Sequence, residues 1–194
     1  GTGFIGYQVV AGLNNAGKHV RVLTRRRERN RHLLVLPYVE VVEADVHDPD
    51  QLKRHFTDRD AVINLIGILN ERGHRGEGFR HVHVELAKKV LEACKHCGVE
   101  RLLHMSALGA DQNRGPSHYL RTKGEAENHL HTFAGPEVAL TSFRPSVVFG
   151  RDDGFFNRFA ALLALGPMLP LACPHAKFAP VYVGDLAKRF VDAL

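Results

Sequence analysis

Two kinds of segment are missing from this sequence, and one residue type is scarce. No apolar run among its 194 residues approaches the roughly 20 residues that a membrane-spanning helix needs. No signal peptide, internal repeat or low-complexity segment is visible either. The three cysteines are an odd number, which fits a reducing compartment better than a disulfide framework. We therefore expect a globular protein without a transmembrane segment, located in the cytoplasm.

The rest of the composition is ordinary for a globular domain. Hydrophobic residues make up 44% of the chain and charged residues 24%, which suffices for one sizeable core. The formal net charge of +5 suggests an anionic ligand or surface, although a solvated basic face is the commoner cause. We expect no nucleic-acid partner.

Strand-like and helix-like segments alternate along the chain. Ile5, Val9 and Leu13 recur at helical spacing, and residues 60–66 form the nearly unbroken apolar run of a strand buried on both faces. Further strands are predicted, with helices between them, at 19–24, 39–44, 101–105 and 138–143. This alternation predicts an α/β fold, a Rossmann-like doubly wound parallel sheet with helices on both faces. Because the chain begins at a glycine turn, the sheet should lack its first strand.

The opening residues Gly-Thr-Gly-Phe-Ile-Gly have the spacing of a phosphate-binding turn that runs into a helix. Gly1 and Gly3 permit backbone angles closed to other residues, and Gly6 lets the helix lie close to a strand. The start of the helix offers unpaired N–H groups and a positive dipole end to a phosphate. The motif counts as a fingerprint only after a strand, and none precedes it here, so a flexible glycine-rich start is the alternative.

Several polar residues and glycines follow the predicted strands directly. In a parallel sheet of this kind, ligands bind outside the carboxyl ends of the strands. The residues expected at those ends are Thr24, Arg25, Asp45, Gly67, Ser106, Arg144, Pro145 and Ser146.

Three arginines, Arg25 to Arg27, follow the strand at 19–24. They stand near the place where NAD-binding proteins carry an acidic residue for the ribose, about 20 residues beyond the glycines. No carboxylate precedes the arginines, and planar guanidinium groups suit a 2′-phosphate. NADP(H) is therefore favoured over NAD(H). The alternative is that most of these arginines only form a solvated face.

Tyr119 and Lys123 form a second candidate group. Residues four apart share a face of the predicted helix at 117–131, so the hydroxyl and the ammonium can point into one site. A neighbouring cation lowers the pKa of a phenol towards the working range of a general acid. Tyr119 would then exchange a proton with a carbonyl or alcohol as hydride moves to or from the nicotinamide. Such pairs are common by chance, and this one gains weight because its helix follows the strand ending at Ser106.

Taken together, these residues resemble the extended and atypical branches of the short-chain dehydrogenase/reductase superfamily. Within those branches the sequence is most similar to the family of the nucleotide-binding accessory subunit of respiratory complex I and its bacterial relatives. The segments that carry the likeness are 1–6, 62–69, 104–111, Arg-Pro-Ser-Val-Val-Phe-Gly at 144–150, 155–159 and Val-Tyr-Val-Gly-Asp at 181–185. The likeness covers nearly the whole chain, and the last two segments make it specific.

The resemblance implies a role for each matching position. Gly1, Gly3 and Gly6 would hold the pyrophosphate, and Phe4 and Ile5 of the same turn would also contact the cofactor. Arg25, with Arg26 as a second candidate, would bind the 2′-phosphate, and Asp45 and Val46 would border the adenine edge. Gly67 would line the sheet edge beside the cofactor, Lys123 would bind the nicotinamide ribose, and Pro145 and Ser146 would pack beside the nicotinamide amide. The catalytic residues would be Tyr119, Lys123 and Ser106, and no metal is implied. Residues 1–150 would form the NAD(P)-binding domain and 151–194 a partial substrate-side region.

The sequence departs from the family pattern where catalysis is concerned. Active members usually present a serine or threonine just beyond Ser106, where Ala107 and Leu108 stand here. Losing such a hydrogen-bond donor costs on the order of a hundredfold in rate. The chain also stops soon after Asp185, where the family continues, so we expect a fragment at both ends.

The resemblance thus implies a nucleotide-binding protein with weak or no turnover. It would act with respiratory complex I or another protein partner, either in the cytoplasm or peripherally at the inner face of the respiratory membrane. Two alternatives stay open. One is a working NADP-dependent reductase or epimerase/dehydratase that uses the Tyr119–Lys123 pair, and the other is a non-enzymatic NADP(H) redox sensor.

Three other patterns have plainer explanations. Cys94 and Cys97 have the spacing of a redox pair or half a zinc site, but Cys94 continues an apolar helical row and Cys173 stands alone, which favours core packing. The thirteen histidines are scattered, so surface positions are favoured over a metal site. The phenylalanines within 155–159 suit a quinone or substrate pocket, although such aromatics more often form a core or an interface.

Overall fold

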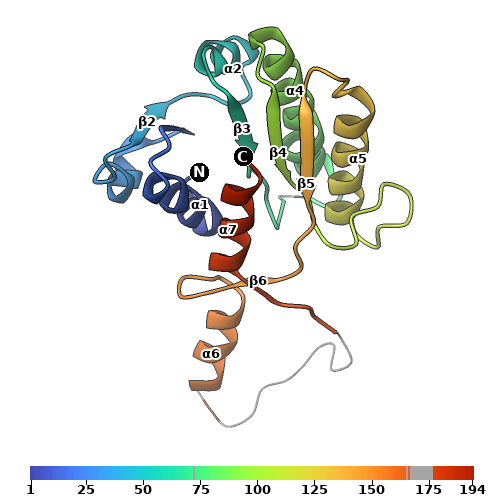
Figure 1. Cartoon of the computed structure of the whole chain (residues 1–194). Coiled ribbons are helices and arrows are strands. Elements are labelled where there is room, and N and C mark those ends of the chain that lie inside the picture. Colours follow the sequence, from blue (N-terminus) through green and yellow to red (C-terminus); the bar gives the residue numbers. More distant parts are fainter. Residues whose placement is uncertain (72, 165, 167–176) are drawn as a thin grey trace.

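The computed structural model describes residues 1–71, 73–164, 166 and 177–194 (Figure 1). The helices are α1 (Phe4–Asn15), α2 (Pro49–Phe56), α3 (Glu77–Phe79), α4 (Leu86–Cys97), α5 (His118–Phe133), α6 (Phe156–Ala164) and α7 (Val183–Asp192), with a 3₁₀ segment η1 (Arg27–Leu33) and a π-helical segment η2 (Arg80–Glu85). The strands are β1 (Val20–Thr24), β2 (Val39–Glu43), β3 (Ala61–Asn64), β4 (Arg101–Met105), β5 (Ala139–Phe143), β6 (Val148–Phe149) and β7 (Val181–Tyr182). No helix in these ranges is long and apolar enough to cross a membrane.

Local sequence signals set several helix ends. Gly17 and Gly98 follow α1 and α4 in the left-handed region, each with a φ of 69° that glycine adopts without strain. Asp48 caps α2, because its Oδ1 accepts a hydrogen bond from the Asp50 amide at 2.9 Å and Pro49 occupies the first turn. The predicted helix before Gly98 is divided into α3, η2 and α4.

Every strand pair in the described part of the chain is parallel, as the sequence predicts. β1 pairs with β2, β4 lies between β3 and β5, and the short strands β6 and β7 form a pair of their own. Within the described ranges, no pairing joins β1 to β3. In the classic doubly wound order the first strand lies at this point. The gap in the pairing therefore falls at the position of that strand in this order.

Two layers of helices cover the opposite faces of the three-stranded sheet (Figure 1). Leu102 of β4 faces the buried cluster formed with α2, α4 and α5. Leu103 faces the cluster formed with α1 and α7, because successive strand side chains point to opposite faces. The α/β fold class is therefore confirmed.

Helix α1 connects the two main sheets. Val9 packs into the cluster with α7 and β4, whereas Val10 packs against Val22 of β1 and Val41 of β2. The helix that follows the glycine turn thus holds β1–β2 and β3–β4–β5 together. Because α7 also packs on α1, part of the 151–194 segment belongs to the core. The proposed division at residue 150 stays a prediction.

Candidate functional site

The strand registers bring the predicted residues to the carboxyl edge of each sheet. Thr24 ends β1 opposite Glu43 of β2, while Met105 and Phe143 are paired directly before Ser106 and Arg144. The loops beyond β4 and β5 are also joined, since the Leu108 amide donates to the Pro145 carbonyl at 2.8 Å. Sequence reasoning therefore found the edge correctly from the ends of the strands.

The glycine turn leads directly into α1, but Gly3 works differently from the prediction. Gly3 has a φ of −87°, which is open to other residues, so the expectation of a restricted backbone angle there is wrong. A Cβ on Gly3 would meet nothing within 4 Å, so its backbone faces open space. A Cβ on Gly6 would lie 2.7 Å from the Gly1 backbone, so Gly6 is required by the turn itself.

The first turn of α1 leaves backbone N–H groups without a side-chain cap. Such groups are the donors that bind an anion at a helix start. The side chains in this turn serve packing instead. Phe4 lies beside Gly150, where an added Cβ would be 3.2 Å from the Phe4 ring, and Ile5 packs against the cluster of α1 and α7.

The arginines in β1 and just after it fall into two groups. Arg21 pairs with Glu40 and Arg31 with Glu28, each at 2.8 Å, so these two belong to a solvated face. Arg25 and Arg26 are exposed, and neither forms an ion pair within the described residues. Arg27 and Arg29 are likewise exposed and take part in none of these ion pairs, so Arg25 and Arg26 are distinguished by their place directly after β1.

The ends of β1 and β2 come together around His47. Asp45 is exposed, and its Oδ1 accepts a hydrogen bond from the His47 amide at 2.9 Å. The His47 ring stacks on that of His81 in η2, with 4.2 Å between the ring centroids. Burial lowers the pKa of His47, and the nearby His81, Lys89 and Arg25 add to the effect while Asp45 opposes it. Val46 packs partly into the core beside this group.

Lys123 of α5 is an almost completely buried ammonium group. Its side chain is among the buried polar residues at 3% exposure, and Nζ donates to the Met105 carbonyl at 2.9 Å. Burial lowers its pKa to about 8. A Cβ added to Gly67 would lie 3.1 Å from Nζ, so the backbone beyond β3 passes close to the ammonium. Gly67 and Lys123, which the sequence predicts as two separate cofactor contacts, therefore lie next to each other.

Tyr119 is half-buried one turn before Lys123. Its ring meets those of His83 and Phe79 edge-on, at centroid distances of 5.4 and 6.0 Å. Burial raises the pKa of Tyr119, because a phenolate loses its hydration there. The expected lowering by the neighbouring cation is therefore wrong for this structure.

Ser106 is buried, and its hydroxyl has a partner. Its Oγ donates to Oε2 of Glu127 on α5 at 2.5 Å. Glu127 is buried as well, and its two carboxylate oxygens share the single N–H of Arg144 Nε, at 2.8 and 2.9 Å. The hydroxyl hydrogen of Ser106 is thus used within the protein, while Pro145 and Ser146 lie partly buried just beyond Arg144.

Sequence reasoning missed the buried polar residues around Lys123. They are Asn64, His83, His104, Thr122 and Glu127. Burial lowers the pKa of both His83 and His104 to about 3, so these imidazoles are neutral. Helical spacing carried one usable signal, because Glu127 stands four residues after Lys123 on the same helix face. The histidines gave none, since their partners come from distant segments.

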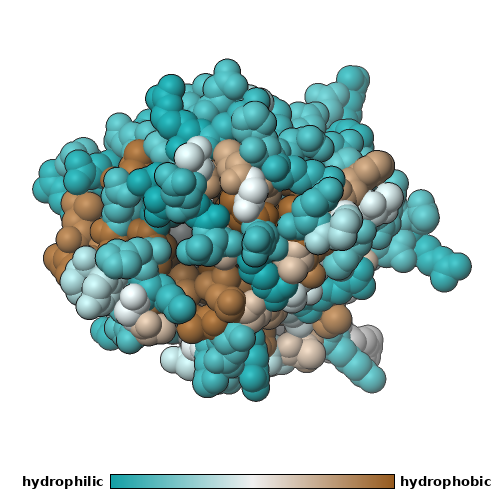
Figure 2. All heavy atoms as spheres, turned by 45° about the horizontal axis from the view of Figure 1, so that its top comes forward, coloured by the Kyte–Doolittle hydropathy of each residue, from teal (hydrophilic) through white to brown (hydrophobic). Residues whose placement is uncertain are grey.

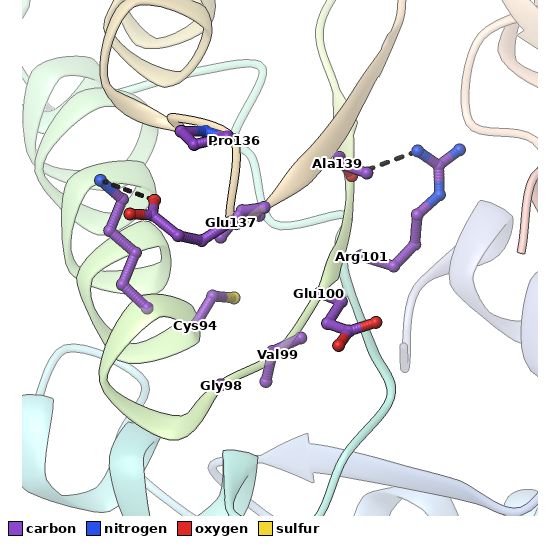
Figure 3. A pocket seen from close by; sticks show the side chains of 10 residues that line it. Cys94, Gly98, Val99, Glu100, Arg101, Pro136, Glu137 and Ala139 are labelled. Carbon is purple, nitrogen blue, oxygen red and sulfur yellow. Dashed lines mark hydrogen bonds and ion pairs between the residues drawn. The ribbon is translucent and has the colours of Figure 1, made fainter.

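A hollow of about 600 Å³ lies at the opposite edge, among the residues where β4 and β5 begin (Figure 3). It is lined by the end of α4, with Cys94, and by Arg101, which donates to the Ala139 carbonyl at 3.1 Å. Figure 2 brings the side of the molecule with the strand starts forward, and this surface is mostly hydrophilic. None of the predicted cofactor contacts lines the hollow.

The cysteines and the phenylalanines of residues 155–159 are the remaining patterns singled out in the sequence. Burial raises the pKa of the Cys94 thiol to about 12, as suits a packed side chain rather than a reactive one. Cys173 lies outside the described residues. Phe155 contacts both Phe156 and Phe159, with ring centroids 5.2 and 5.1 Å apart.

Residues 1–149 match the family model described as NAD(P)H-binding. The chain belongs to this family. It is 35% identical to the mouse (Mus musculus) mitochondrial NADH dehydrogenase (ubiquinone) 1 alpha subcomplex subunit 9, over 99% of this chain and 51% of the mouse protein. It is 30% identical to a ceramide reductase of Caulobacter vibrioides, over 98% of this chain and 57% of that protein. The chain therefore spans about half the length of these relatives, and the resemblance to the complex I subunit family is confirmed.

Solved structures agree on the fold. MoeE5 in complex with UDP-glucuronic acid and NAD superposes with a TM-score of 0.83 at 23% identity, over 99% of this chain and 69% of MoeE5. At that identity the likeness shows the Rossmann-like architecture alone. The NAD(P)H-binding assignment comes from the family match over residues 1–149.

Proposed function

We propose that this NAD(P)H-binding protein holds NADPH at the carboxyl edge of its sheet with weak or no turnover. The observation that carries the proposal is the hydrogen bond from Ser106 to Glu127, which occupies the hydroxyl that would polarise a carbonyl. The raised pKa of Tyr119 supports it, because a less acidic phenol is a poorer general acid at neutral pH. The first turn of α1 would hold the pyrophosphate, and Lys123 the nicotinamide ribose.

The preference for NADP(H) over NAD(H) belongs to the same proposal. It is supported by Arg25 and Arg26, whose guanidinium groups have no ion-pair partner in the described part of the chain. Asp45 and Val46 would border the adenine, while Pro145 and Ser146 would pack beside the nicotinamide amide.

A titration of the intact protein with NADPH and NADH tests the preference. We expect NADPH to bind more tightly, and Arg25→Ala to weaken NADPH by about tenfold through the lost phosphate contact while leaving NADH unchanged. Arg31→Ala, at an arginine already paired with Glu28, is the matched control. Equal affinity of the wild-type protein for both nucleotides would contradict the preference.

Turnover is tested separately. We expect the protein to keep its bound NADPH and not to oxidise it when carbonyl compounds are added. Steady oxidation that Tyr119→Phe abolishes would instead favour a working reductase.

We also propose a protein partner. The mouse relative is named as a subunit of NADH dehydrogenase (ubiquinone). By that likeness, this protein would associate with respiratory complex I and lie peripherally at the membrane that carries it. Copurification of the intact protein with the complex, in mild detergent, is the expected result. Migration apart from the complex on native gels would argue against this partner.

A further inference from the structure

His83 is a buried ring that connects two segments of the site. It lies in η2 and is only 2% exposed. On one side, the Ile68 amide donates to its Nε2 at 3.2 Å. On the other side, its Nδ1 lies 2.9 Å from the Thr122 hydroxyl of α5. The ring therefore bridges the loop after β3 and the helix that carries Tyr119 and Lys123.

These partners determine where the imidazole carries its proton. A backbone amide only donates, so Nε2 must accept and is unprotonated. The proton is then on Nδ1, which donates to the Thr122 oxygen. Thr122 can direct its own hydrogen to the His118 carbonyl, 2.8 Å away. Every polar atom of the bridge is satisfied, which a buried polar group requires.

The bridge lies directly beside the proposed nicotinamide position. Gly67 precedes Ile68, and a Cβ there would approach both Lys123 Nζ, at 3.1 Å, and His83 Nε2, at 3.5 Å. The His83 ring also supports the Tyr119 ring edge-on. One side chain therefore fixes the distance between the loop after β3 and the exposed end of α5.

The local helix geometry contributes to this position. η2 is a π-helical segment between α3 and α4. A π-helical turn contains one more residue than an α-helical turn, so its side chains point in directions shifted from those of a regular α-helix. Phe79 fills the space beside the His83 ring, with centroids 5.6 Å apart.

We propose that His83 is a positioning residue for the nicotinamide half of the bound dinucleotide, acting through Ile68 and Thr122. This inference rests on the proposed function, in which Gly67 and Lys123 border the nicotinamide ribose. The adenosine half, at the ends of β1 and β2, does not depend on the bridge. His83 should thus affect one half of the ligand and spare the other.

The experiment compares two ligands on variants of the intact protein. NADPH reports on the whole site, and adenosine 2′,5′-bisphosphate reports on the adenosine half alone. His83→Phe keeps a ring of similar shape against Phe79 and Tyr119 but removes both hydrogen bonds. We expect the Kd for NADPH to rise about tenfold and the Kd for the bisphosphate to stay within about twofold.

Thr122 supplies the second variant and its control. Thr122→Val removes the hydroxyl that accepts the hydrogen bond from His83 Nδ1, whereas Thr122→Ser keeps it, so only the valine variant should reproduce the selective loss. This pair decides the question if His83→Phe does not fold. A parallel loss of both ligands, or no loss of either, in the folded variants would overturn the role of His83. Failure of the wild-type protein to bind either ligand would instead overturn the proposed function, and the inference with it.

Discussion

At the scale of single residues, burial decides the chemistry of the site more than sequence neighbours do. Tyr119 and Lys123 stand four apart on α5, as the sequence predicts, yet each has its pKa shifted mainly by lost hydration. Both shifts favour the neutral form, because a charge buried without full compensation is costly. Tyr119 and Lys123 therefore share a helix face as predicted, but burial, and not the interaction between them, shifts their pKa values.

Lys123 gives a prediction on stability. Its folded pKa of about 8 lies below the ordinary value of 10.5, so the unfolded chain binds the proton more tightly and the folded state is penalised at pH 7. The penalty is fully present below pH 8 and is relieved as the pH rises from 8 towards 10.5. Lys123→Met should raise the free energy of unfolding by about 1–3 kcal/mol at pH 7, and by less at pH 9.5.

Urea denaturation at the two pH values measures this difference. Lys123→Met should also bind NADPH more weakly. A variant that is more stable but binds less tightly would show that Lys123 serves ligand binding at the expense of stability. A destabilised variant at pH 7 would show that the hydrogen bond to Met105 outweighs the buried charge.

At the scale of elements, α7 is a determinant of the core although it comes last in the chain. Phe190 is completely buried, and its ring stacks on that of Phe143 of β5 with 4.0 Å between centroids. The same cluster includes Leu13 of α1, so α7 supports the helix that begins at the glycine turn.

Phe190→Ala should therefore cost about 3–5 kcal/mol of stability, the usual range for deleting a buried aromatic ring. Chemical denaturation measures the loss. Phe133→Ala, at an exposed phenylalanine of α5, is the control and should change little. A loss below about 1 kcal/mol for Phe190 would mean that α7 is not part of the cooperative core.

At the scale of the whole molecule, the two main sheets are joined through α1 rather than through strand pairing in the described ranges. The proposed dinucleotide would contact both, through Arg25 at β1 and Lys123 beside β4. Ligand binding should therefore stabilise the two sheets together.

NADPH at 100 times its Kd should add about 2.7 kcal/mol to the free energy of unfolding. Amide hydrogen exchange should show added protection in β1–β2 and in β3–β4–β5. Adenosine 2′,5′-bisphosphate should protect β1–β2 more than the other sheet. Equal protection of both sheets by the bisphosphate would contradict the proposed ligand orientation.

The sequence by itself determined the alternation of strands and helices, the parallel sheet, and the residues at its carboxyl edge. Periodicity and turn residues carry this information locally, and parallel strands bring their ends together whatever their spacing in the chain. The ends of the predicted strands placed Gly67 and Ser106 at this edge. The sequence itself also shows that no carboxylate stands directly before Arg25.

Only the tertiary structure decided which polar groups are free. Ser106 meets Glu127 across 21 positions of sequence, and His83 meets Ile68 and Thr122 from two different segments. Hydrogen-bond partners and desolvation both depend on atoms brought together by folding, so no local pattern reports them. The sequence therefore predicts a candidate site at the carboxyl edge of the sheet, while the packing around Lys123 determines the chemistry that it can support.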